Sequence, residues 1–549
     1  MRVRLFLMLS IAAAAAHAQP KIQSGGVVNA ASYFSIGGQG FNPIAPGSYF
    51  VIFGSGLGPS TLAVGSLPFG TALPGATGTS VTFSSLNGPS YKAYLYYAGA
   101  TQVSGILPSN VPPQQYNVTV TYNGVTSKPE PVFVTPANPG LFTRNQAGFG
   151  TVKAQAFRSA TDYFEPTLSA PAAPGQVIAL YGTGLGAANA PDNAAPGAVQ
   201  VKGPVTVYVN GEAVTPAYAG RSPQYPGLDQ INFTLPTDLA PGCYTDLVVG
   251  VAGFSSNVVS IPTAAAGATC THPLGLNAAA LAKLDAGGTV NVGLLALFSG
   301  IQAGGSGSPQ DAAVAAIFTM NADNVVQMLR QGGNPNQSPI RLPAGSCGLW
   351  DANGPNRSPD LDFTTWGTDL SAASAITLTN PTGKAVSLTS GAAAGLGGGF
   401  IALLPQGTLV PGAWTLAASS ATIGTVGATV TAPPVVSWTG PPQDGASVPR
   451  TATTFSWTGG GGLVNVVGQA QTSSNGSKEF TCAFPATDGK GTVPASVLGQ
   501  LPLPAPGDSN FAGVLAMLAD TYGTFGTPGK LDGSMTIFAS GGAHAVVWK

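Results

Sequence analysis

The chain has 549 residues, which is enough for about three to five domains of ordinary size, and it carries 20 Lys and Arg against 21 Asp and Glu. Charged residues make up only 7% of the sequence, and the near-neutral balance argues against a surface for nucleic acid or anionic membrane. The 44% hydrophobic content argues against a disordered coat, while 76 Gly and 47 Pro indicate many short strands joined by turns.

Residues 1–18 have the pattern of a signal peptide. Arg2 and Arg4 precede an apolar stretch over residues 5–16, and Ala-His-Ala at 16–18 fits the rule for cleavage. Every later apolar run is interrupted by Gly, Pro or polar residues, so the sequence predicts no transmembrane segment. We therefore expect an exported protein that is secreted, periplasmic or held at the outer surface.

A sequence motif that occurs twice predicts the domain organisation of the first half of the chain. Phe-Gly-Ser-Gly-Leu-Gly at residues 53–58 recurs as Tyr-Gly-Thr-Gly-Leu-Gly at 181–186, and the offset is 128 residues. An internal repeat of this kind indicates tandem modules. Alternating apolar strands in each copy lead us to expect two β-sandwiches, at residues 19–137 and 138–263.

The second half of the sequence does not continue this repeat. After a linker at residues 263–271, we expect two further β-rich domains, at 271–434 and 435–549, divided at Pro433-Pro434. Residues 276–284 suit one short helix, whereas residues 321–330 suit a helix or a strand equally well.

The repeated modules resemble the Solibacter-type carboxy-terminal modules, which are Ig-like sandwiches akin to IPT/TIG domains and common in secreted proteins. The likeness covers about residues 26–262. It rests on residues 28–32, 44–48 and 53–58 in the first copy, on residues 139–143 between the modules, and on residues 181–186, 209–211, 218–220, 229–233 and 256–257 in the second copy. A weaker likeness to a partner region of such proteins covers residues 271–549, carried by residues 426–428, 448–450, 457–460 and 492–498. The resemblance implies an all-β fold of tandem Ig-like domains and an exported location, with no reaction or catalytic residue to carry over.

Cysteine usage predicts disulfides. An exported chain with four cysteines has three possible pairings. We favour Cys243–Cys270, which brackets the exit from the second repeat and would stabilise the fold by about 3 kcal/mol on the chain-entropy model. Cys347–Cys482 follows by exclusion, and the alternative is that both remain free thiols. The first copy has Gln115 where the second has Cys243, so we expect only the second to carry a disulfide.

The glycine phrases are expected to be turns. A phosphate-binding loop would need a helix after the glycines, yet Pro59 follows the first copy and no Lys-Ser/Thr follows either. No Gly-x-Ser-x-Gly elbow occurs, and beyond the signal peptide only His272 and His544 remain, each of which we expect to be a surface histidine and not a catalytic base. We therefore predict no cofactor and no zinc site.

Calcium is the strongest metal candidate. Asp351, Asn353, Asp360 and Asp362 are dense for so charge-poor a chain, and oxygen ligands suit Ca²⁺. Their spacing does not fit an EF-hand loop, so we favour capping of turns as their role.

Three tyrosines are candidate ligand contacts: Tyr91, Tyr94 and Tyr96. On one continuous strand, Tyr94 and Tyr96 share a face and Tyr97 takes the other. The function we favour is a non-enzymatic exported interaction or scaffold protein that binds protein or polysaccharide at the cell exterior. The alternatives are a carbohydrate-binding protein with coplanar exposed aromatics, and a hydrolase with an unrecognised carboxylate pair in residues 271–440.

Overall fold

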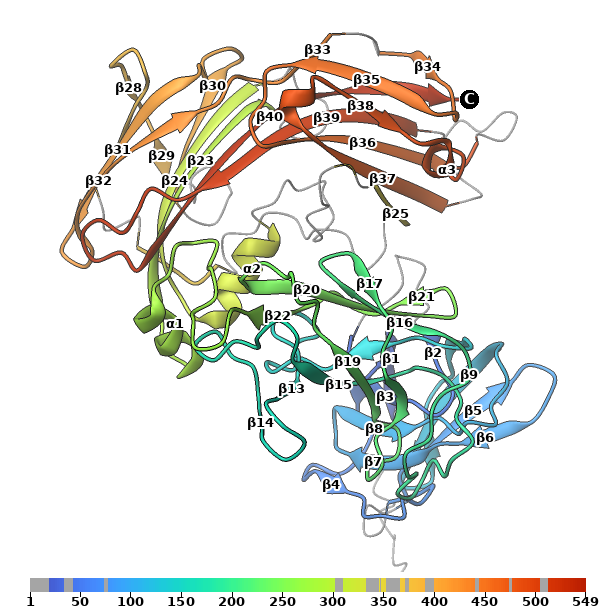
Figure 1. Cartoon of the computed structure of the whole chain (residues 1–549). Helices are drawn as coiled ribbons and strands as arrows, with labels where there is room; N and C mark the ends of the chain where they lie inside the picture. The colour runs from blue at the N-terminus through green and yellow to red at the C-terminus, as the bar shows by residue number, and fades with distance from the viewer. Residues whose placement is uncertain are drawn as a thin grey trace, which may run out of the picture.

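The computed structural model shows a chain built almost wholly of β-strands (Figure 1). It describes residues 19–33, 43–73, 78–301, 310–331, 345, 347–351, 366–370, 375–390, 399–439, 444–472, 476–503 and 512–549. The predicted signal peptide, residues 1–18, lies outside the described residues, and so do Asn353, Asp360 and Asp362 among the calcium candidates.

The first module is a sandwich of two sheets. One sheet has the spatial order β1 (Lys21–Asn29), β3 (Tyr49–Ser55), β8 (Gln102–Ile106), β7 (Tyr94–Ala98), β4 (Ala63–Val64). The other has the order β2 (Pro43–Ile44), β11 (Glu130–Val134), β9 (Gln115–Tyr122), β5 (Ser80–Ser85), β6 (Ser90–Lys92), with β10 (Val125–Thr126) pairing β9. Alternate residues of both sheets fill the core between them, where the rings of Phe50 and Phe83 meet edge to face at 5.3 Å.

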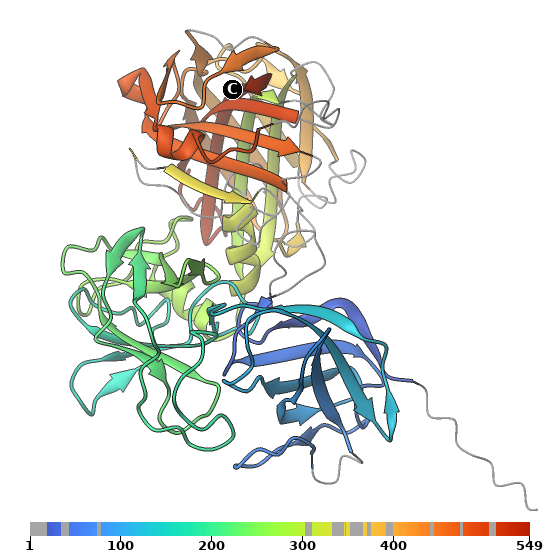
Figure 2. The same ribbon diagram turned by 90° about the vertical axis from the view of Figure 1, so that its right-hand side faces the viewer.

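The second module repeats this plan. Its first sheet has the order β14 (Tyr163–Phe164), β13 (Ala154–Phe157), β15 (Val177–Thr183), β19 (Asp229–Thr234), β18 (Tyr218–Arg221), with β12 (Gly140–Leu141) pairing β15. Its second sheet has the order β17 (Glu212–Val214), β16 (Val205–Val209), β20 (Gly242–Val251), β21 (Phe254–Ser255), with β22 (Val259–Thr263) pairing β20. The two sandwiches lie side by side beneath the C-terminal half (Figure 2). The structure thus confirms the prediction of tandem Ig-like sandwiches in an all-β chain.

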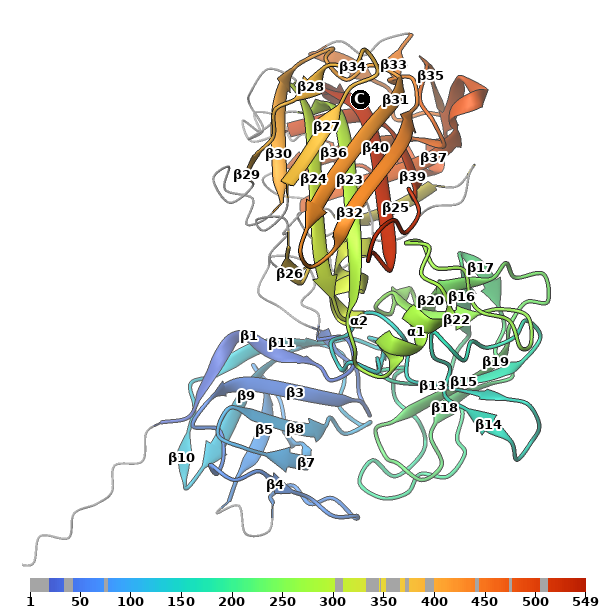
Figure 3. The ribbon, with the colours of Figure 1, turned by 90° about the vertical axis from the view of Figure 1, so that its left-hand side faces the viewer.

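The C-terminal half is organised around one sheet of eleven strands. Its order is β25 (Cys347–Asp351), β37 (Gly476–Pro485), β36 (Leu463–Thr472), β39 (Ala512–Gly523), β40 (Gly533–Trp548), β23 (Val290–Ile301), β24 (Gln310–Met320), β30 (Phe400–Pro405), β29 (Thr389–Ser390), with β26 (Thr368–Asp369) on β24 and β34 (Ala446–Val448) on β40. The strands β23, β24 and β40 run side by side as long central members (Figure 3).

Two smaller sheets pack against opposite parts of this sheet. The first has the order β28 (Ala385–Val386), β27 (Ala375–Thr379), β31 (Gly412–Ser420), β32 (Gly424–Ala432), and the second has the order β33 (Ser437–Trp438), β35 (Thr453–Thr458), β38 (Lys490–Val493). Each encloses its own core with the large sheet, around Trp414 in one case and around Trp457 and Trp548 in the other.

The predicted boundary between 271–434 and 435–549 is therefore not a boundary between separate sheets. Strand β40, from the end of the chain, pairs in parallel with β23 over Val292–Ser299 and Gly533–Ser540, and its last residues pair with β34. Because β40 has 16 residues, it is long enough to serve both sandwiches. The two predicted domains share one continuous sheet.

The short helices lie where the chain enters or leaves a sheet. They are α1 (Ala278–Asp285), α2 (Ala322–Gln331), α3 (Ala495–Leu498) and the 3-10 turn at Ala486–Asp488. Asn277 caps α1, since its side-chain oxygen accepts a hydrogen bond from Ala280 N, and Leu281 and Leu284 of this helix are buried. The ambiguous segment 321–330 is thus helical, as α2.

Candidate functional site

The repeated glycine phrase ends strand β15 of the second module in a tight turn. Gly184 and Gly186 have φ of 101° and 104°, which is the region that favours glycine. A Cβ at Gly184 would lie 2.0 Å from Asn138 O, so the turn also needs the close approach of another backbone. The phrase forms a turn, as predicted, and no helix begins there.

A buried ion pair organises this turn. Asp229 accepts hydrogen bonds from Leu185 N, at 2.8 Å, and from the Arg221 guanidinium, which also donates to Gly186 O at 2.7 Å. Both side chains are almost fully buried. Burial raises the pKa of Asp229, while the Arg221 charge and the backbone N–H groups oppose that rise. The sequence did not predict a role for Arg221, because a single arginine outside any motif does not indicate a buried ion pair.

The first two modules are joined by direct hydrogen bonds. Asn29 donates to Asn138 O at 2.8 Å and to Thr183 O at 3.3 Å, and Tyr49 N donates to Thr183 Oγ1 at 2.8 Å. Across the same joint, Asp192 accepts hydrogen bonds from both N and Oγ of Ser109, at 2.6 and 2.7 Å. These contacts cross between buried or half-buried groups, so they fix the orientation of one sandwich against the other.

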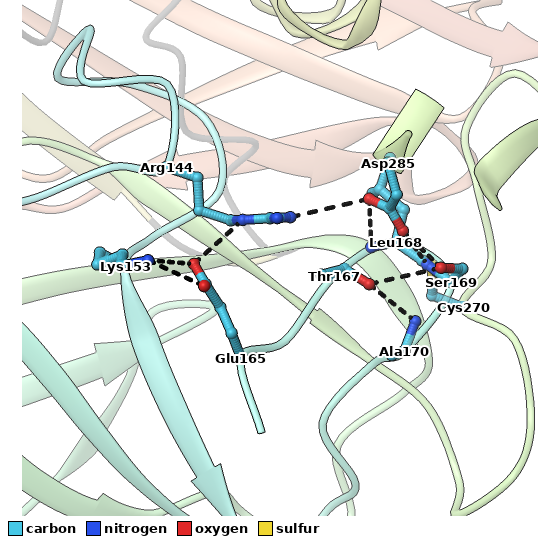
Figure 4. Close-up of polar contacts among 9 residues, drawn as sticks. All are labelled: Arg144, Lys153, Glu165, Thr167, Leu168, Ser169, Ala170, Cys270 and Asp285. Atoms are coloured by element: carbon cyan, nitrogen blue, oxygen red, sulfur yellow. Dashed lines mark hydrogen bonds and ion pairs between the residues drawn. The ribbon is translucent and has the colours of Figure 1, made fainter. Parts of the chain in front are cut away.

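The second module is likewise fixed to the C-terminal half (Figure 4). Asp285, at the end of α1, accepts hydrogen bonds from Leu168 N at 3.2 Å, Ser169 N at 2.7 Å and Ser169 Oγ at 2.6 Å. Arg144 lies between Asp285, at 3.8 Å, and Glu165, at 3.1 Å. The carboxylate thus binds a loop of the second module to the first helix of the C-terminal half.

The segment predicted as a linker, 263–271, is part of this joint. Ala264 and Cys270 are buried in the same apolar cluster as Leu281 of α1 and Val292 of β23. Cys243 and Cys270 form a disulfide, as predicted, and so do Cys347 and Cys482 on the paired strands β25 and β37. The linker is therefore anchored covalently and by burial.

His272 lies buried beside this disulfide. Its Nδ1 accepts a hydrogen bond from Leu274 N at 3.1 Å, which leaves Nε2 to donate to the Tyr244 hydroxyl at 3.2 Å. Burial lowers the pKa of His272 to about 3, so the ring is neutral at physiological pH. The sequence predicted a surface histidine, and the structure shows a core one.

Two carboxylates in residues 271–440, Asp311 and Asp369, accept hydrogen bonds from backbone N–H groups. Asp311 is fully buried and accepts from Ser299 Oγ at 2.9 Å, Gly300 N at 3.2 Å and Leu409 N at 2.8 Å. Asp369 accepts from Gly399 N at 2.8 Å. Within the described ranges, no three His, Cys, Asp or Glu side chains gather as a metal site would require, and no helix is long and apolar enough to cross a membrane.

A cluster of aromatic rings surrounds Tyr96 of strand β7, in the sheet β1-β3-β8-β7-β4, and within it Phe69 is buried whereas Tyr96 is partly exposed. The ring of Tyr96 lies 5.5 Å from Tyr49, 5.6 Å from Phe69 and 5.6 Å from Tyr97, with interplanar angles of 56–67°. Burial, with Tyr33 and Tyr96 nearby, raises the pKa of Tyr97 to about 12, so this cluster carries no charge at neutral pH.

An exposed apolar strip borders these rings along the edge of the sheet. Val64, on edge strand β4, pairs with Tyr97 across the strands, and Gly65 N donates to Tyr96 O at 2.7 Å. The exposed fractions are 58% for Leu62, 61% for Val64, 47% for Leu67 and 40% for Tyr96. We name Leu62, Val64, Leu67 and Tyr96 the Tyr96 strip.

The predicted set of three tyrosines is divided between the two sheets. Tyr91 lies on β6 in the opposite sheet, where its ring contacts Tyr116 at 6.0 Å, because the chain changes sheets between Lys92 and Tyr94. A register shift between Leu95 and Tyr97 also brings Tyr97 to the same face as Tyr96. The expectation that Tyr97 takes the other face was therefore wrong, and Tyr49 and Phe69 were missed as members of the cluster.

Comparisons with known proteins give remote likenesses. No family model matches the chain, and no curated protein matches it. Among solved structures, SGBP-B of a Bacteroides ovatus mixed-linkage glucan utilization locus, in complex with a mixed-linkage heptasaccharide, has 12% identity over 91% of this chain and 95% of that one, with a TM-score of 0.13. A tetra-tandem repeat from the extending region of a large adhesion protein has 13% identity over 91% and 98%, and immunoglobulin domains 1–4 of Sidekick-1 have 9% over 93% and 96%, both with TM-scores of 0.13. At such TM-scores these likenesses carry no argument about what the chain binds.

Proposed function

We propose that this chain is an exported, non-enzymatic binding and scaffold protein that presents the Tyr96 strip to a protein partner. The observation that carries the proposal is the exposure of Leu62, Val64 and Leu67 in one short stretch of the first module, together with Tyr96 on β7, the strand that pairs with β4. Contiguous exposed apolar surface next to aromatic rings is characteristic of protein interaction sites. The two disulfides support export, because such bonds persist in oxidising compartments.

The joints between modules support the scaffold part of the proposal. Asn29, Asp192 and Asp285 each hold a neighbouring module through more than one hydrogen bond. A surface carried on rigidly joined elements binds with a smaller loss of conformational entropy than one on a flexible tether. The Tyr96 strip therefore has a fixed position relative to the C-terminal half.

The geometry of the rings favours a protein partner over a sugar. The C–H face of a pyranose chair packs on the face of an aromatic ring, so a sugar chain favours coplanar rings, whereas Tyr96 is tilted by 56–67° from Tyr49, Phe69 and Tyr97. Polysaccharide binding remains the alternative, and the same variants distinguish the two.

The test immobilises the full mature chain and its variants, and measures what each retains from the source's own envelope and secreted fractions. Val64→Asp and Tyr96→Ser should each abolish retention of the partner, because both place polarity in the strip without touching the core. Tyr163→Ser is the matched control, since Tyr163 is 53% exposed in the second module, away from the strip. A partner retained equally by all variants refutes the proposal, and loss of a purified polysaccharide in the strip variants establishes the alternative.

A further inference from the structure

The outermost strand of the four-stranded sheet, β32, has an open edge. β32 pairs with β31 along its whole length, from Gly412 opposite Ala432 to Ser420 opposite Gly424, without a bulge. It ends the order β28-β27-β31-β32, so it has a neighbour on one side alone among the described strands. Figure 1 shows β32 at the left-hand border of the molecule.

The direction of the backbone groups follows from one contact at the start of the strand. Ile423 O accepts a hydrogen bond from Lys530 N at 2.9 Å, on the side away from β31. The backbone N–H and C=O groups of successive residues point to opposite sides of an antiparallel strand, so every second residue points the same way. The N–H and C=O of Gly427, Thr429 and Thr431 therefore point away from β31, as Ile423 O does. No hydrogen bond between described residues uses these six groups.

Part of the edge is already covered, and this limits what can pair with it. A Cβ at Gly529 would lie 2.8 Å from Thr425 O, so the loop before β40 occupies the edge up to Thr425. The open segment is Val426–Ala432. Charged residues, prolines and β-bulges are the features that keep edge strands from associating. This segment contains no charged residue and no proline, and its pairing with β31 has no bulge.

We propose that the open segment of β32 pairs antiparallel with the same segment of a second copy of this chain, with the two-fold axis at Thr429. In this register Thr429 faces the partner's Thr429, and Gly427 faces the partner's Thr431 on either side. All six outward backbone groups of each copy then form hydrogen bonds. A register centred one residue earlier would place the partner against the loop at Gly529.

The distribution of charge favours a second copy as the occupant. Around a two-fold axis every side chain lies near its own counterpart, so a charged residue would be repelled by itself. Residues 424–432 are Gly, Thr, Val and Ala only, and the described outward-facing residues of β27 and β31 are also uncharged. On the inner face, Ala428 and Val430 would extend the apolar core across the axis, and on the outer face Thr429 would pair with threonine.

The test measures self-association of the full mature chain by sedimentation velocity over a concentration series. Thr429→Lys should raise the dimer dissociation constant roughly tenfold or more, because two like charges would face each other at the axis. Thr415→Lys is the matched control: Thr415 lies opposite Thr429 on the same exposed face but on the interior strand, so the charges remain apart and the dimer should persist.

Disulfide cross-linking through an introduced cysteine tests where the two copies meet. The structure has no free cysteine among its described residues, and all four cysteines of the chain are in disulfides. Thr429→Cys should therefore yield a disulfide-linked dimer on non-reducing gels, whereas Thr415→Cys should yield none. A chain that stays monomeric at all concentrations, or dimers equally insensitive to both lysines, overturns the proposal. Tyr96→Ser should leave the dimer intact, so failure here and failure of the proposed function are separate results.

Discussion

Loss of the Asp229 carboxylate should destabilise the second module far more than an ordinary single substitution does. Asp229→Ala leaves the Arg221 charge buried without a partner and deprives Leu185 N of its acceptor. Breaking a buried pair by removing one member costs about 3–5 kcal/mol, because the remaining charge stays desolvated. We expect a loss of this size in the free energy of opening of this module.

The first module supplies the comparison, because its copy of the glycine motif has no ion pair at the corresponding positions. At the 128-residue offset, Ala93 and Thr101 stand where Arg221 and Asp229 stand. There Leu57 N, the counterpart of Leu185 N, donates to a backbone acceptor, Ala100 O, at 3.0 Å. Replacing both charges together, as Arg221→Ala with Asp229→Thr, removes the unpaired charge and should recover at least about 1 kcal/mol relative to Asp229→Ala.

Hydrogen exchange of amides in β15 and β19 is the suitable assay, because a chain of several modules has no single free energy of unfolding. The exchange rates give the opening free energy of this module directly. If Asp229→Ala changes it by less than about 1 kcal/mol, or the double variant is as unstable as the single one, the reasoning from burial is refuted.

Three further predictions concern the joint between the second module and the C-terminal half. Cys243→Ser with Cys270→Ser should lower stability by about 3.5 kcal/mol on the chain-entropy model, checked by exchange in β20 and β22, and an unchanged opening free energy would contradict it. The pKa of His272 falls from 6.5 to about 3 on folding, so between these values the unfolded chain binds an extra proton and the free energy of unfolding decreases as the pH is lowered. His272→Gln should remove up to about 1.4 kcal/mol per pH unit of that decline, and equal slopes of unfolding free energy against pH would refute this. Asp285→Ala should speed thermolysin cleavage before Leu168, whereas Arg144→Ala, which removes a partly exposed ion pair, should not, and equal rates would disprove the role of the carboxylate.

Local patterns in the sequence were sufficient for features that depend on neighbouring residues. The Gly-x-Gly-Leu-Gly phrases predicted turns because glycine alone accepts the positive φ that Gly184 and Gly186 adopt. The cysteine count and the place of Cys243 and Cys270 around the exit from the second repeat predicted that disulfide, whereas Cys347 and Cys482 were left open between a disulfide and two free thiols. The 128-residue offset predicted two sandwiches of the same plan, since similar alternation of apolar residues buries similar faces.

The position of the aromatic side chains at the candidate site could not be predicted from the alternation of apolar and polar residues alone. The run from Tyr91 to Tyr97 looks continuous, yet the chain changes sheets within it and a bulge then turns Tyr97 to the face of Tyr96. A period of two specifies which residues share a face only while the strand stays in one sheet and in register. The exposure of Val64 and Leu67 likewise depends on where the edge of the sheet falls.

The sequence by itself determined the strands, the turns and the repeat, because these follow from the period of apolar residues and from glycine. Only the tertiary structure decided which strands are partners. Val292 and Gly533 lie 241 residues apart, yet they are neighbours in the eleven-stranded sheet that joins the two predicted C-terminal domains. A strand's backbone groups bond to any strand of suitable length, so the choice of partner is made by the burial of whole faces and by which edges remain open.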